Sequence, residues 1–281
     1  MILVTGAGGK TGRAIVRALV ARGTAVDAFV HREAHVAPLR ALGARHVRVG
    51  SLDNYAALGE AVRGAEAVYH LAPNVSPDEF LFGQTVAAAT HEANVRRLVF
   101  HSVLRPEIEA MPHHWEKARV EEMLAVSRLE VTVLRPTAYM QNLLQGWPAI
   151  VKDGVYRVPY SVEARISLVD LGDVAEIAAR ILCEKGHEGA TYELVGTKPL
   201  SQVEVAETLA DALGRPVRVA AESIEDWSAR AKGLSDYARD ALIKMFRYYD
   251  RHGLAGDPAV LRRLLGREPR TLSEFAASLR P

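Results

Sequence analysis

Glycines near the amino terminus are spaced for contact with a diphosphate. Gly6, Gly9 and Gly12 follow the short apolar run Ile2–Val4, and a helical pattern begins near Ala14. We expect the first glycine to permit a tight turn, the second to let backbone approach a pyrophosphate, and the third to let a helix pack on a strand. The helix start would present free N–H groups and the positive end of its dipole to the phosphates. The expected cofactor contacts in this loop are Gly6, Gly8, Gly9, Lys10, Thr11 and Gly12.

This loop has two other interpretations. Gly9-Lys10-Thr11 resembles the end of a Walker loop, but that motif needs a glycine five residues earlier, where Val4 stands. A glycine-rich turn without a ligand is the second alternative. The later strands fit a dinucleotide-binding fold, which favours the nucleotide interpretation.

The residues after the second apolar run indicate which dinucleotide is bound. An NAD site usually has Asp or Glu at the end of this strand, whereas here the run ends in His31 and Arg32, with Asp27 too early and Glu33 just after. An arginine fork would bind a 2′-phosphate that a carboxylate would repel. We therefore predict NADP(H) in preference to NAD(H), the alternative being that Arg32 is a solvated loop residue.

Two further loops are expected beside the cofactor. Asp53 follows the third apolar run and could meet the adenine edge or cap the next helix. Ala72 and Pro73 follow the fourth run and would pass beside the riboses.

Strand and helix patterns that alternate along the first half must position these groups. Apolar runs alternate with helical patterns such as Tyr55–Val62 and Phe80–Ala93, which predicts an α/β fold with a doubly wound parallel sheet of Rossmann type. The six expected strands are Ile2–Val4, Ala25–Val30, His46–Val49, Ala67–Leu71, Leu98–Phe100 and Val131–Leu134. The expected cofactor domain is residues 1–136, with 166–184 returning to it.

A smaller, discontinuous α+β domain is expected over residues 137–281, where it would shape a substrate pocket. Asp170–Leu182 is an amphipathic helical pattern, which Asp170 and Asp173 begin. Ser201–Leu213 is a second helix, with Ser201 and Glu204 as a capping box and Gly214 as its stop. The remaining expected elements are a strand at Val217–Ala220 and helices at Ile224–Ala231, Tyr237–Tyr249, Ala259–Leu265 and Leu272–Leu279.

Composition excludes several classes of protein. With 35 Lys and Arg against 34 Asp and Glu in 281 residues, the chain shows no basic face for nucleic acid. The one cysteine, Cys183, fits a reducing compartment, and its helical pattern predicts a buried, inert thiol. No apolar run approaches membrane-spanning length, and a strand at residue 2 leaves no room for a signal peptide. We expect a cytoplasmic protein.

Several segments together resemble a known family. The opening glycine pattern is similar to that of extended and atypical short-chain dehydrogenases/reductases. Segments 134–142, 167–175 and 192–196 are similar to the NmrA-like branch, which holds quinone and triphenylmethane-dye reductases beside catalytically silent regulators that sense NADP(H). The resemblance spans residues 1 to about 220 and implies a Rossmann fold and a nicotinamide cofactor.

The resemblance also implies catalytic residues. In the wider superfamily a Tyr-x-x-x-Lys pair follows the fifth strand, with a tyrosine proton donor, a lysine that binds the nicotinamide ribose, and a Ser or Thr that assists. Lys117 matches the lysine and Ser102 the serine, but His113 stands where tyrosine is expected. His113 could act as an acid that titrates near neutrality, or have no chemical role. If His113 has no chemical role, the site would catalyse hydride transfer by positioning alone, or would have no catalytic activity. Ser102 is equally consistent with a plain strand-end residue.

The residues after the sixth run are expected to form the substrate pocket. Pro136 would contact the cofactor. The expected pocket residues are Thr137, Tyr139, Met140, Asn142, Trp147, Tyr156 and Tyr160, although core packing could explain each aromatic residue. An apolar, aromatic pocket suits a flat hydrophobic acceptor better than a sugar nucleotide. No metal site is expected, because His101, His113 and His114 lack ligand spacing.

Together these features predict an NADPH-dependent reductase of a small quinone-like or carbonyl acceptor. A non-catalytic NADP(H)-sensing regulator is the main alternative, and a sugar-nucleotide epimerase is disfavoured by the missing tyrosine. We expect a small-molecule substrate and neither nucleic-acid nor membrane binding. The residues leave open a homo-oligomer or a regulatory protein partner.

Overall fold

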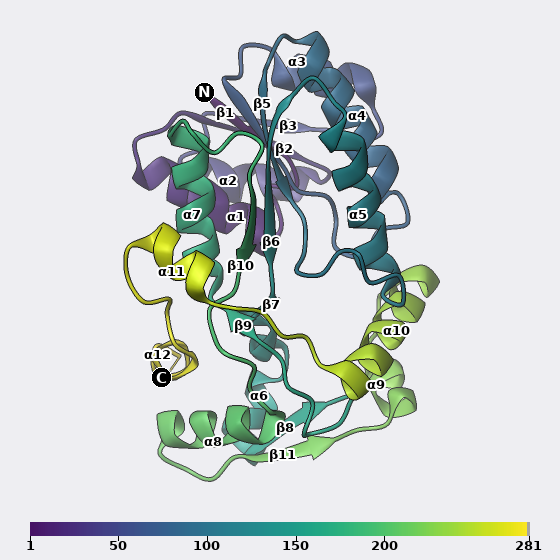
Figure 1. Cartoon of the computed structure of the whole chain (residues 1–281), viewed down its shortest axis with the longest axis vertical. Helices are drawn as coiled ribbons and strands as arrows, with labels where there is room; N and C mark the ends of the chain where they lie inside the picture. The colour runs from purple at the N-terminus through teal and green to yellow at the C-terminus, as the bar shows by residue number, and fades with distance from the viewer. Residues whose placement is uncertain (280–281) are drawn as a thin grey trace. The chain divides into compact units, whose positions relative to one another are not determined.

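The structure, a computed structural model, describes residues 1–279 and contains a seven-stranded sheet (Figure 1). The strand order is β3-β2-β1-β4-β5-β6-β10, and the register is parallel throughout the five pairs from β3 to β6. The strands are β1 (Ile2–Val4), β2 (Val26–Val30), β3 (His46–Val49), β4 (Ala67–His70), β5 (Arg97–His101), β6 (Glu130–Pro136) and β10 (Thr191–Leu194). The order reverses between β1 and β4, so the carboxyl ends of these two strands form the switch point where such sheets bind ligands.

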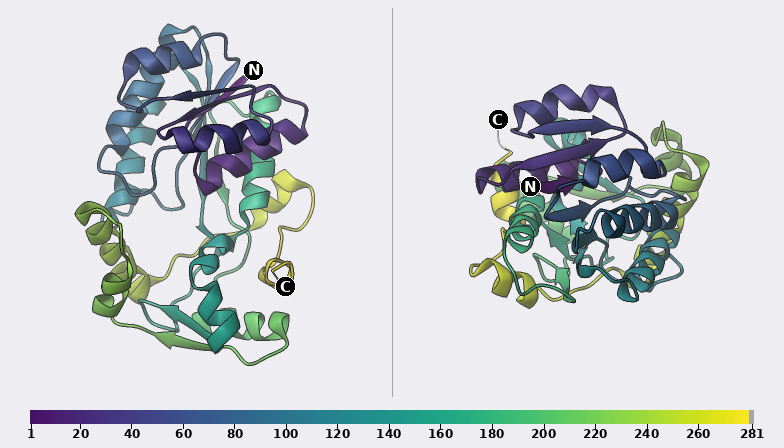
Figure 2. Two further views of the ribbon diagram at one scale, coloured as in Figure 1. Left: turned by 180° about the vertical axis from the view of Figure 1, so that it is seen from behind. Right: turned by 90° about the horizontal axis from the view of Figure 1, so that it is seen from above.

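Helices cover both faces of this sheet (Figures 1 and 2). One face carries α3 (Tyr55–Val62), α4 (Glu79–Glu92) and α5 (Pro112–Ala125), and the other carries α1 (Lys10–Ala21), α2 (Val36–Ala41) and α7 (Leu171–Cys183). A short 3-10 helix, η1 (Glu33–His35), leads into α2. The apolar core under α3, α4 and α5 includes Phe29, Val68, Leu98, Phe100, Val86 and Val120. Because strands buried on both faces are continuously apolar, the sequence revealed strands such as β1, β4 and β5 directly, whereas the predicted edge strand β3 is largely exposed.

The seventh strand, β10, was not expected from the sequence. Thr191 is exposed and Tyr192 and Glu193 are half-buried, so the segment lacks the apolar run of the other strands. Its place in the sheet depends on hydrogen bonds with a distant segment, such as Val133 N–H to Ala190 O at 2.9 Å. Pairing of this kind is decided by tertiary contacts rather than by local pattern.

Cys183 is a second difference from expectation. The thiol was predicted to be buried, but the residue is exposed at the last position of α7, with Sγ 3.2 Å from Thr24 Oγ1. The helix ends here, and its apolar face ends with the buried Ile181 and Leu182. The prediction was wrong because the apolar pattern was carried one residue too far.

The described chain divides into two compact units. Unit 1 consists of residues 1–107, 113–135 and 174–192, and unit 2 of residues 108–112, 136–173 and the chain from Glu193 onward. Among residues 1–279, no helix is both long and apolar enough to cross a membrane.

Unit 2 contains two small parallel strand pairs and several short helices. β7 (Ala138–Tyr139) pairs with β9 (Leu168–Val169), and β8 (Val155–Val158) pairs with β11 (Arg218–Ala221). The helices are η2 (Met140–Gln145), α6 (Trp147–Asp153), α8 (Gln202–Leu213), α9 (Ile224–Arg230), α10 (Asp236–His252), α11 (Ala259–Leu265) and α12 (Leu272–Ala277). Its core joins η2, α6, α8 and α12 through Met140, Ile150, Leu209 and Phe275.

The predicted capping box is confirmed at the start of α8. The Glu204 N–H donates to Ser201 Oγ at 3.2 Å, and the Ser201 N–H donates to Glu204 Oε2 at 2.6 Å. Gly214 ends the helix with φ of 65°. Local chemistry therefore sets both ends of this helix.

Candidate cofactor and active site

The glycine loop joins β1 to α1 in unit 1. Gly6 has φ of 59°, and a Cβ there would lie 2.3 Å from the Leu71 carbonyl oxygen. A Cβ at Gly12 would lie 2.4 Å from the Gly6 oxygen, whereas one at Gly9 would meet only that oxygen, at 3.7 Å, among the described residues. Packing inside the protein thus requires glycine at positions 6 and 12 but not at position 9. An open position at Gly9 fits close approach by a ligand.

The first turn of α1 adds groups that suit an anion. Gly9 is its N-cap, no side chain caps the helix, and the first turn holds no acidic residue. Arg13 Nε, in the same turn, is buried and has no hydrogen-bond partner within residues 1–279. Burial lowers the pKa of Lys10. A buried guanidinium nitrogen without an acceptor, beside free helix N–H groups, fits the diphosphate of a dinucleotide.

The end of β2 presents His31 and Arg32, both exposed, before η1. Asp27, in the middle of β2, is buried and accepts hydrogen bonds from Arg45 Nε and His46 Nδ1, each at 3.2 Å. The carboxylate within β2 is therefore already paired, and the charged residues that follow the strand end are the exposed Arg32 and Glu33.

The structure of the loop at Asp53 tests whether this residue caps the next helix. Asn54, not Asp53, is the N-cap of α3, and its side-chain oxygen accepts from the Ala57 N–H at 3.1 Å. The helix-cap interpretation of Asp53 is wrong by one residue. Asp53 itself is exposed, and its contact with adenine remains a prediction.

The loop after β4 carries backbone strain. Ala72 is buried and Pro73 exposed, and Val75 has φ of 55°. A left-handed conformation costs about 1–2 kcal/mol for a residue with a Cβ, and it is rarer still for a β-branched one. Such strain persists only where surrounding contacts fix the chain, and strained residues cluster at functional sites. This loop leads directly into Glu79, the first residue of α4.

Lys117 lies on α5 with its ammonium group held on three sides. Nζ donates to Glu79 Oε1 at 2.8 Å and to the His101 carbonyl oxygen at 3.3 Å, and lies 5.4 Å from the centre of the Phe100 ring. The Glu79 side chain is 3% exposed and that of Lys117 is 13% exposed. Sequence reasoning missed Glu79, because an acidic residue at a helix start has a common structural explanation.

Ser102, directly after β5, is buried in a charged network. Its hydroxyl donates to Glu121, which also accepts from Arg135 Nε at 3.1 Å and Nη2 at 2.5 Å. The serine is thus engaged by α5.

His113, the second residue of α5, occupies the position where the family tyrosine is expected. Nδ1 is buried without a hydrogen-bond partner among the described residues, and the ring meets that of His114 edge-on at 4.7 Å. Burial, followed by electrostatic interactions with the His114 ring and the Lys117 ammonium group, lowers the pKa of His113 to about 3. The imidazole is therefore neutral at pH 7, unlike the near-neutral titration expected from the sequence. An acid catalyst works best with a pKa near the working pH.

Two further buried histidines end the neighbouring strands. His70 Nδ1 lies 3.0 Å from Thr5 Oγ1, and its Nε2 is buried without a partner in the described part of the chain. His101 Nδ1 is hydrogen-bonded to the Tyr69 hydroxyl. Burial, followed by the charge of Lys117, lowers the pKa of both histidines to about 3. The sequence offered one signal for them, a polar residue that closes an apolar run.

The expected pocket residues belong to unit 2. Met140 has no exposed surface and lies in the core, against which Trp147 and Tyr156 pack. The Tyr156 hydroxyl donates to Gln202 Oε1 at 2.8 Å, and the Tyr160 ring lies 5.8 Å from that of Tyr249. These contacts show packing for Trp147, Tyr156 and Tyr160.

The other residues after β6 differ in exposure. Thr137 is buried and donates to the Ser167 carbonyl oxygen at 2.9 Å. Pro136, the last residue of β6, is buried, Tyr139 is half-buried and Asn142 is exposed. A substrate role for the residues after β6 remains a prediction.

Asp170 and Asp173 lie at the start of α7, as expected. Asp170 Oδ1 accepts from the Gly172 N–H at 2.7 Å, and Asp173 accepts from the Arg270 N–H at 2.7 Å and from Arg267 Nη2 at 2.9 Å. Both carboxylates thus have structural partners.

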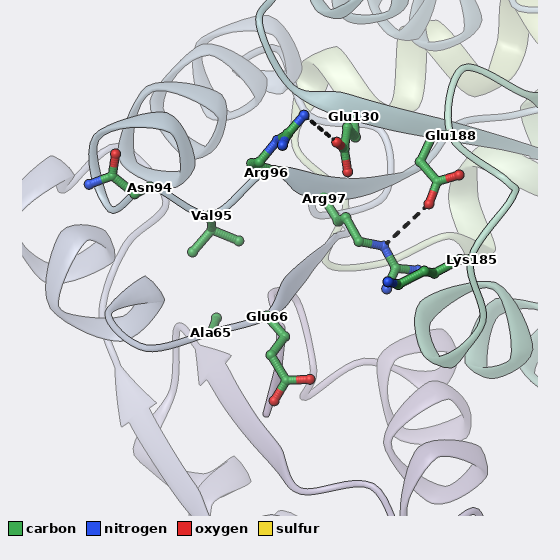
Figure 3. Close-up of a pocket in the computed structure, with 9 residues that line it drawn as sticks. All are labelled: Ala65, Glu66, Asn94, Val95, Arg96, Arg97, Glu130, Lys185 and Glu188. Atoms are coloured by element: carbon green, nitrogen blue, oxygen red, sulfur yellow. Dashed lines mark ion pairs between the residues drawn. The ribbon is translucent and has the colours of Figure 1, made fainter.

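A surface depression in unit 1 is a poor candidate for the site (Figure 3). It lies beside the starts of β5 and β6, whereas the glycine loop and the buried histidines follow the strand ends. Arg96 pairs with Glu130 at 2.6 Å, and Arg97 donates to the carbonyl oxygens of Ile181 and Glu184 at 2.7 and 2.6 Å. These two arginines stabilise the amino ends of β5 and β6 and the end of α7. Among residues 1–279 no cluster of three or more His, Cys, Asp or Glu side chains could hold a metal ion.

Comparison with known proteins identifies the family. The NmrA-like family matches residues 1–276. The chain belongs to the NmrA-like family. Its NmrA-like relatives include an NAD(P)H azoreductase of Xenophilus azovorans, 30% identical over 98% of this chain and 96% of the relative. Quinone oxidoreductase 2 of Escherichia coli is 29% identical over 99% of this chain and 98% of its own length. The structure of that enzyme with NADPH has a TM-score of 0.86, with 99% of each chain covered.

These comparisons agree with the Rossmann fold and the reductase predicted from the sequence. The azoreductase and the quinone oxidoreductase both match along nearly the whole chain, and the quinone oxidoreductase has been solved with NADPH. The glycine loop, Arg13 and Lys117 supply groups that fit such a cofactor.

Proposed function

We propose that this protein is an NADPH-dependent reductase of a small, apolar, quinone-like or carbonyl acceptor. The observation that carries the proposal is the first turn of α1, where Gly9 is open and Arg13 Nε is buried without an acceptor. The relatives named as azo and quinone reductases supply the reaction class. The glycine loop would bind the cofactor, and Thr137, Tyr139 and Asn142 are the proposed acceptor contacts.

NADPH is proposed over NADH because of the charges at the end of β2. Arg32 is exposed there, while Asp27 is buried and ion-paired with Arg45. A guanidinium fork binds a 2′-phosphate through two charge-assisted hydrogen bonds. His31 beside it would add a further donor.

The side chains around β4 and β5 would position and stabilise rather than transfer protons. The bound cofactor supplies the hydride, and Lys117 would hold its nicotinamide ribose. The ammonium group also stabilises negative charge that develops on the acceptor. His113, neutral at pH 7 with a pKa of about 3, would orient the acceptor through a hydrogen bond, and water would supply the proton.

The test is the loss of NADPH absorbance with purified protein and a panel of quinones, azo dyes and aldehydes. We expect turnover of at least one quinone or azo dye, faster with NADPH than with NADH. Replacement of His113 by Phe tests the proton source. An unchanged kcat between about pH 6 and 8 supports water, and a loss that is greatest at low pH, where a histidine acid carries its proton, supports an acid role.

The rival function is an NADP(H)-sensing regulator, and one observation favours it: the family tyrosine is replaced by a histidine that is neutral at pH 7. Tight NADPH binding without turnover of any acceptor would contradict the reductase proposal and support the sensor.

A further inference from the structure

The buried ion pair between α4 and α5 carries an inference that rests on the proposed role of Lys117. We propose that Glu79 is the positioning residue for Lys117, holding its ammonium group at the carboxyl end of β5 where the nicotinamide ribose would bind. In the wider superfamily the lysine acts together with a tyrosine four residues earlier. Here His113 stands at that position, and the charged partner comes from another helix.

The contacts of Lys117 explain why a partner is needed. A lysine side chain is flexible and carries a point charge, so its ammonium position depends on what surrounds it. Two of its contacts come from β5: the His101 carbonyl oxygen at 3.3 Å and the centre of the Phe100 ring at 5.4 Å. They restrict the position of the ammonium group on the side that faces this strand. Glu79 Oε1, at 2.8 Å, is the shortest of the three contacts and comes from α4. Glu79 therefore selects one position for the ammonium group along β5.

The start of α4 suits this carboxylate. Glu79 is the first residue of a 14-residue helix, where free N–H groups and the positive dipole end attract a carboxylate. The loop before it contains the buried Val75 in a left-handed conformation, which persists only where surrounding contacts hold the chain. The buried Glu79 side chain is thus carried by the first turn of a helix.

Other charged groups near Lys117 have different partners. On α5, Glu121 pairs with Arg135 of β6 and Glu116 pairs with Arg119. The neighbouring histidines, His70 of β4, His101 of β5, and His113 and His114 of α5, have pKa values of about 3 to 4 and are neutral at pH 7. Loss of Glu79 would leave the Lys117 ammonium group buried without a counter-charge. This state is unfavourable, and the ammonium group would be free to move elsewhere.

The experiment is a double-mutant cycle with Glu79→Gln, Lys117→Met and both together, read by NADPH affinity and steady-state kinetics. We expect Glu79→Gln to raise the Kd and KM for NADPH about tenfold or more, because a misplaced ammonium group no longer meets the ribose. The KM for the acceptor should change by less than about twofold. In the Lys117→Met background, Glu79→Gln should cause no further loss beyond about twofold.

Asp27→Asn is the matched control, since Asp27 is also a buried, ion-paired carboxylate of unit 1. It should leave the KM for NADPH within about twofold of the wild type. If Glu79→Gln folds poorly, Glu79→Met with Lys117→Met replaces the pair by apolar side chains, a change that buried ion pairs often tolerate. That variant should fold and match Lys117→Met in NADPH affinity.

The outcomes separate the inference from the function on which it rests. Additive losses in the double variant, or a Glu79→Gln variant that behaves like Asp27→Asn, would overturn the positioning role of Glu79. Unaltered NADPH binding and turnover in Lys117→Met would instead overturn the proposed role of Lys117.

Discussion

Single residues of the glycine loop separate internal packing from ligand binding. Gly6 and Gly12 lie where any Cβ would collide with backbone, while a Cβ at Gly9 would have space. The same distinction applies to charges: Asp27 is satisfied by protein partners, whereas Arg13 Nε is buried without one in the described chain. A residue whose type is not required by its contacts inside the protein is the better candidate for a ligand contact.

Gly9→Ala should therefore bind NADPH poorly yet fold normally. Its backbone, with φ of −76° and ψ of 172°, accepts alanine without strain, so we expect Tm within about 2 °C of the wild type. NADPH affinity should fall about tenfold or more, because a methyl group would occupy the path of the diphosphate. Calorimetry and fluorescence titration check both effects. Gly12→Ala is the contrasting variant and should lose stability, and equal loss of stability in both variants would contradict the argument.

Arg32→Asp should weaken NADPH binding about tenfold or more and leave NADH binding almost unchanged, because only NADPH carries the 2′-phosphate. The dissociation constants of the two cofactors measure the effect. Arg40→Asp, an exposed arginine of α2, is the control for net charge. Equal effects on both cofactors would remove Arg32 from the site.

At the scale of elements, helix starts do most of the positioning. α1 presents an uncapped first turn, α4 presents Glu79, and α5 carries His113 and Lys117 one turn apart. Helices such as α8 and α12 are capped by their own side chains, but α6 and α11 lack such a cap without any proposed ligand role. An uncapped start does not by itself identify a binding helix, and at α1 the buried Arg13 Nε is the additional observation.

Ser201→Ala should lower the free energy of unfolding by about 1 kcal/mol, since it removes one half of the capping box of α8. Urea unfolding measures the change. Ser201→Asp keeps an oxygen that can accept from the helix N–H groups and should remain within about 0.5 kcal/mol of the wild type. A Ser201→Ala variant as stable as Ser201→Asp would show that packing alone holds α8.

At the scale of the whole molecule, the buried histidines make stability depend on pH. Burial holds the pKa of His70, His101 and His113 at about 3 and that of His114 at about 4. In the unfolded chain these groups would titrate near 6.5. Between about pH 6.5 and 4 the unfolded state therefore binds more protons than the folded state, and stability falls as the pH falls.

We expect the free energy of unfolding to fall as the pH is lowered from about 7 to 5. Each buried histidine contributes about 1 kcal/mol per pH unit, because it is protonated in the unfolded state and neutral in the folded state. Urea unfolding at several pH values measures it. His70→Phe should reduce this slope, whereas His91→Gln, at an exposed position on α4, should not. A slope unaffected by His70→Phe would place the protonated groups elsewhere.

Periodicity and turn chemistry were enough to predict much of the fold. Strand ranges such as His46–Val49, the helix Tyr55–Val62 and the Ser201 cap were predicted from the sequence, because apolar runs, helical spacing and caps are local signals. Strand β10, the exposure of Cys183 and the N-cap at Asn54 were missed, since each depends on pairing partners or on a shift of one residue. The proposed site shows the same division, with Lys117 identified by spacing and Glu79 not identified at all.

The sequence by itself determined the strand-glycine-helix opening and the alternation that makes a parallel sheet, because these depend on neighbours within a few residues. It also placed a basic group at the end of the second strand. Only the tertiary structure decided that Glu79 meets Lys117, that the strand-end histidines are neutral, and that Arg13 Nε lacks a partner in the described chain. These properties arise from burial and from contacts between distant segments, which spacing along the chain does not encode.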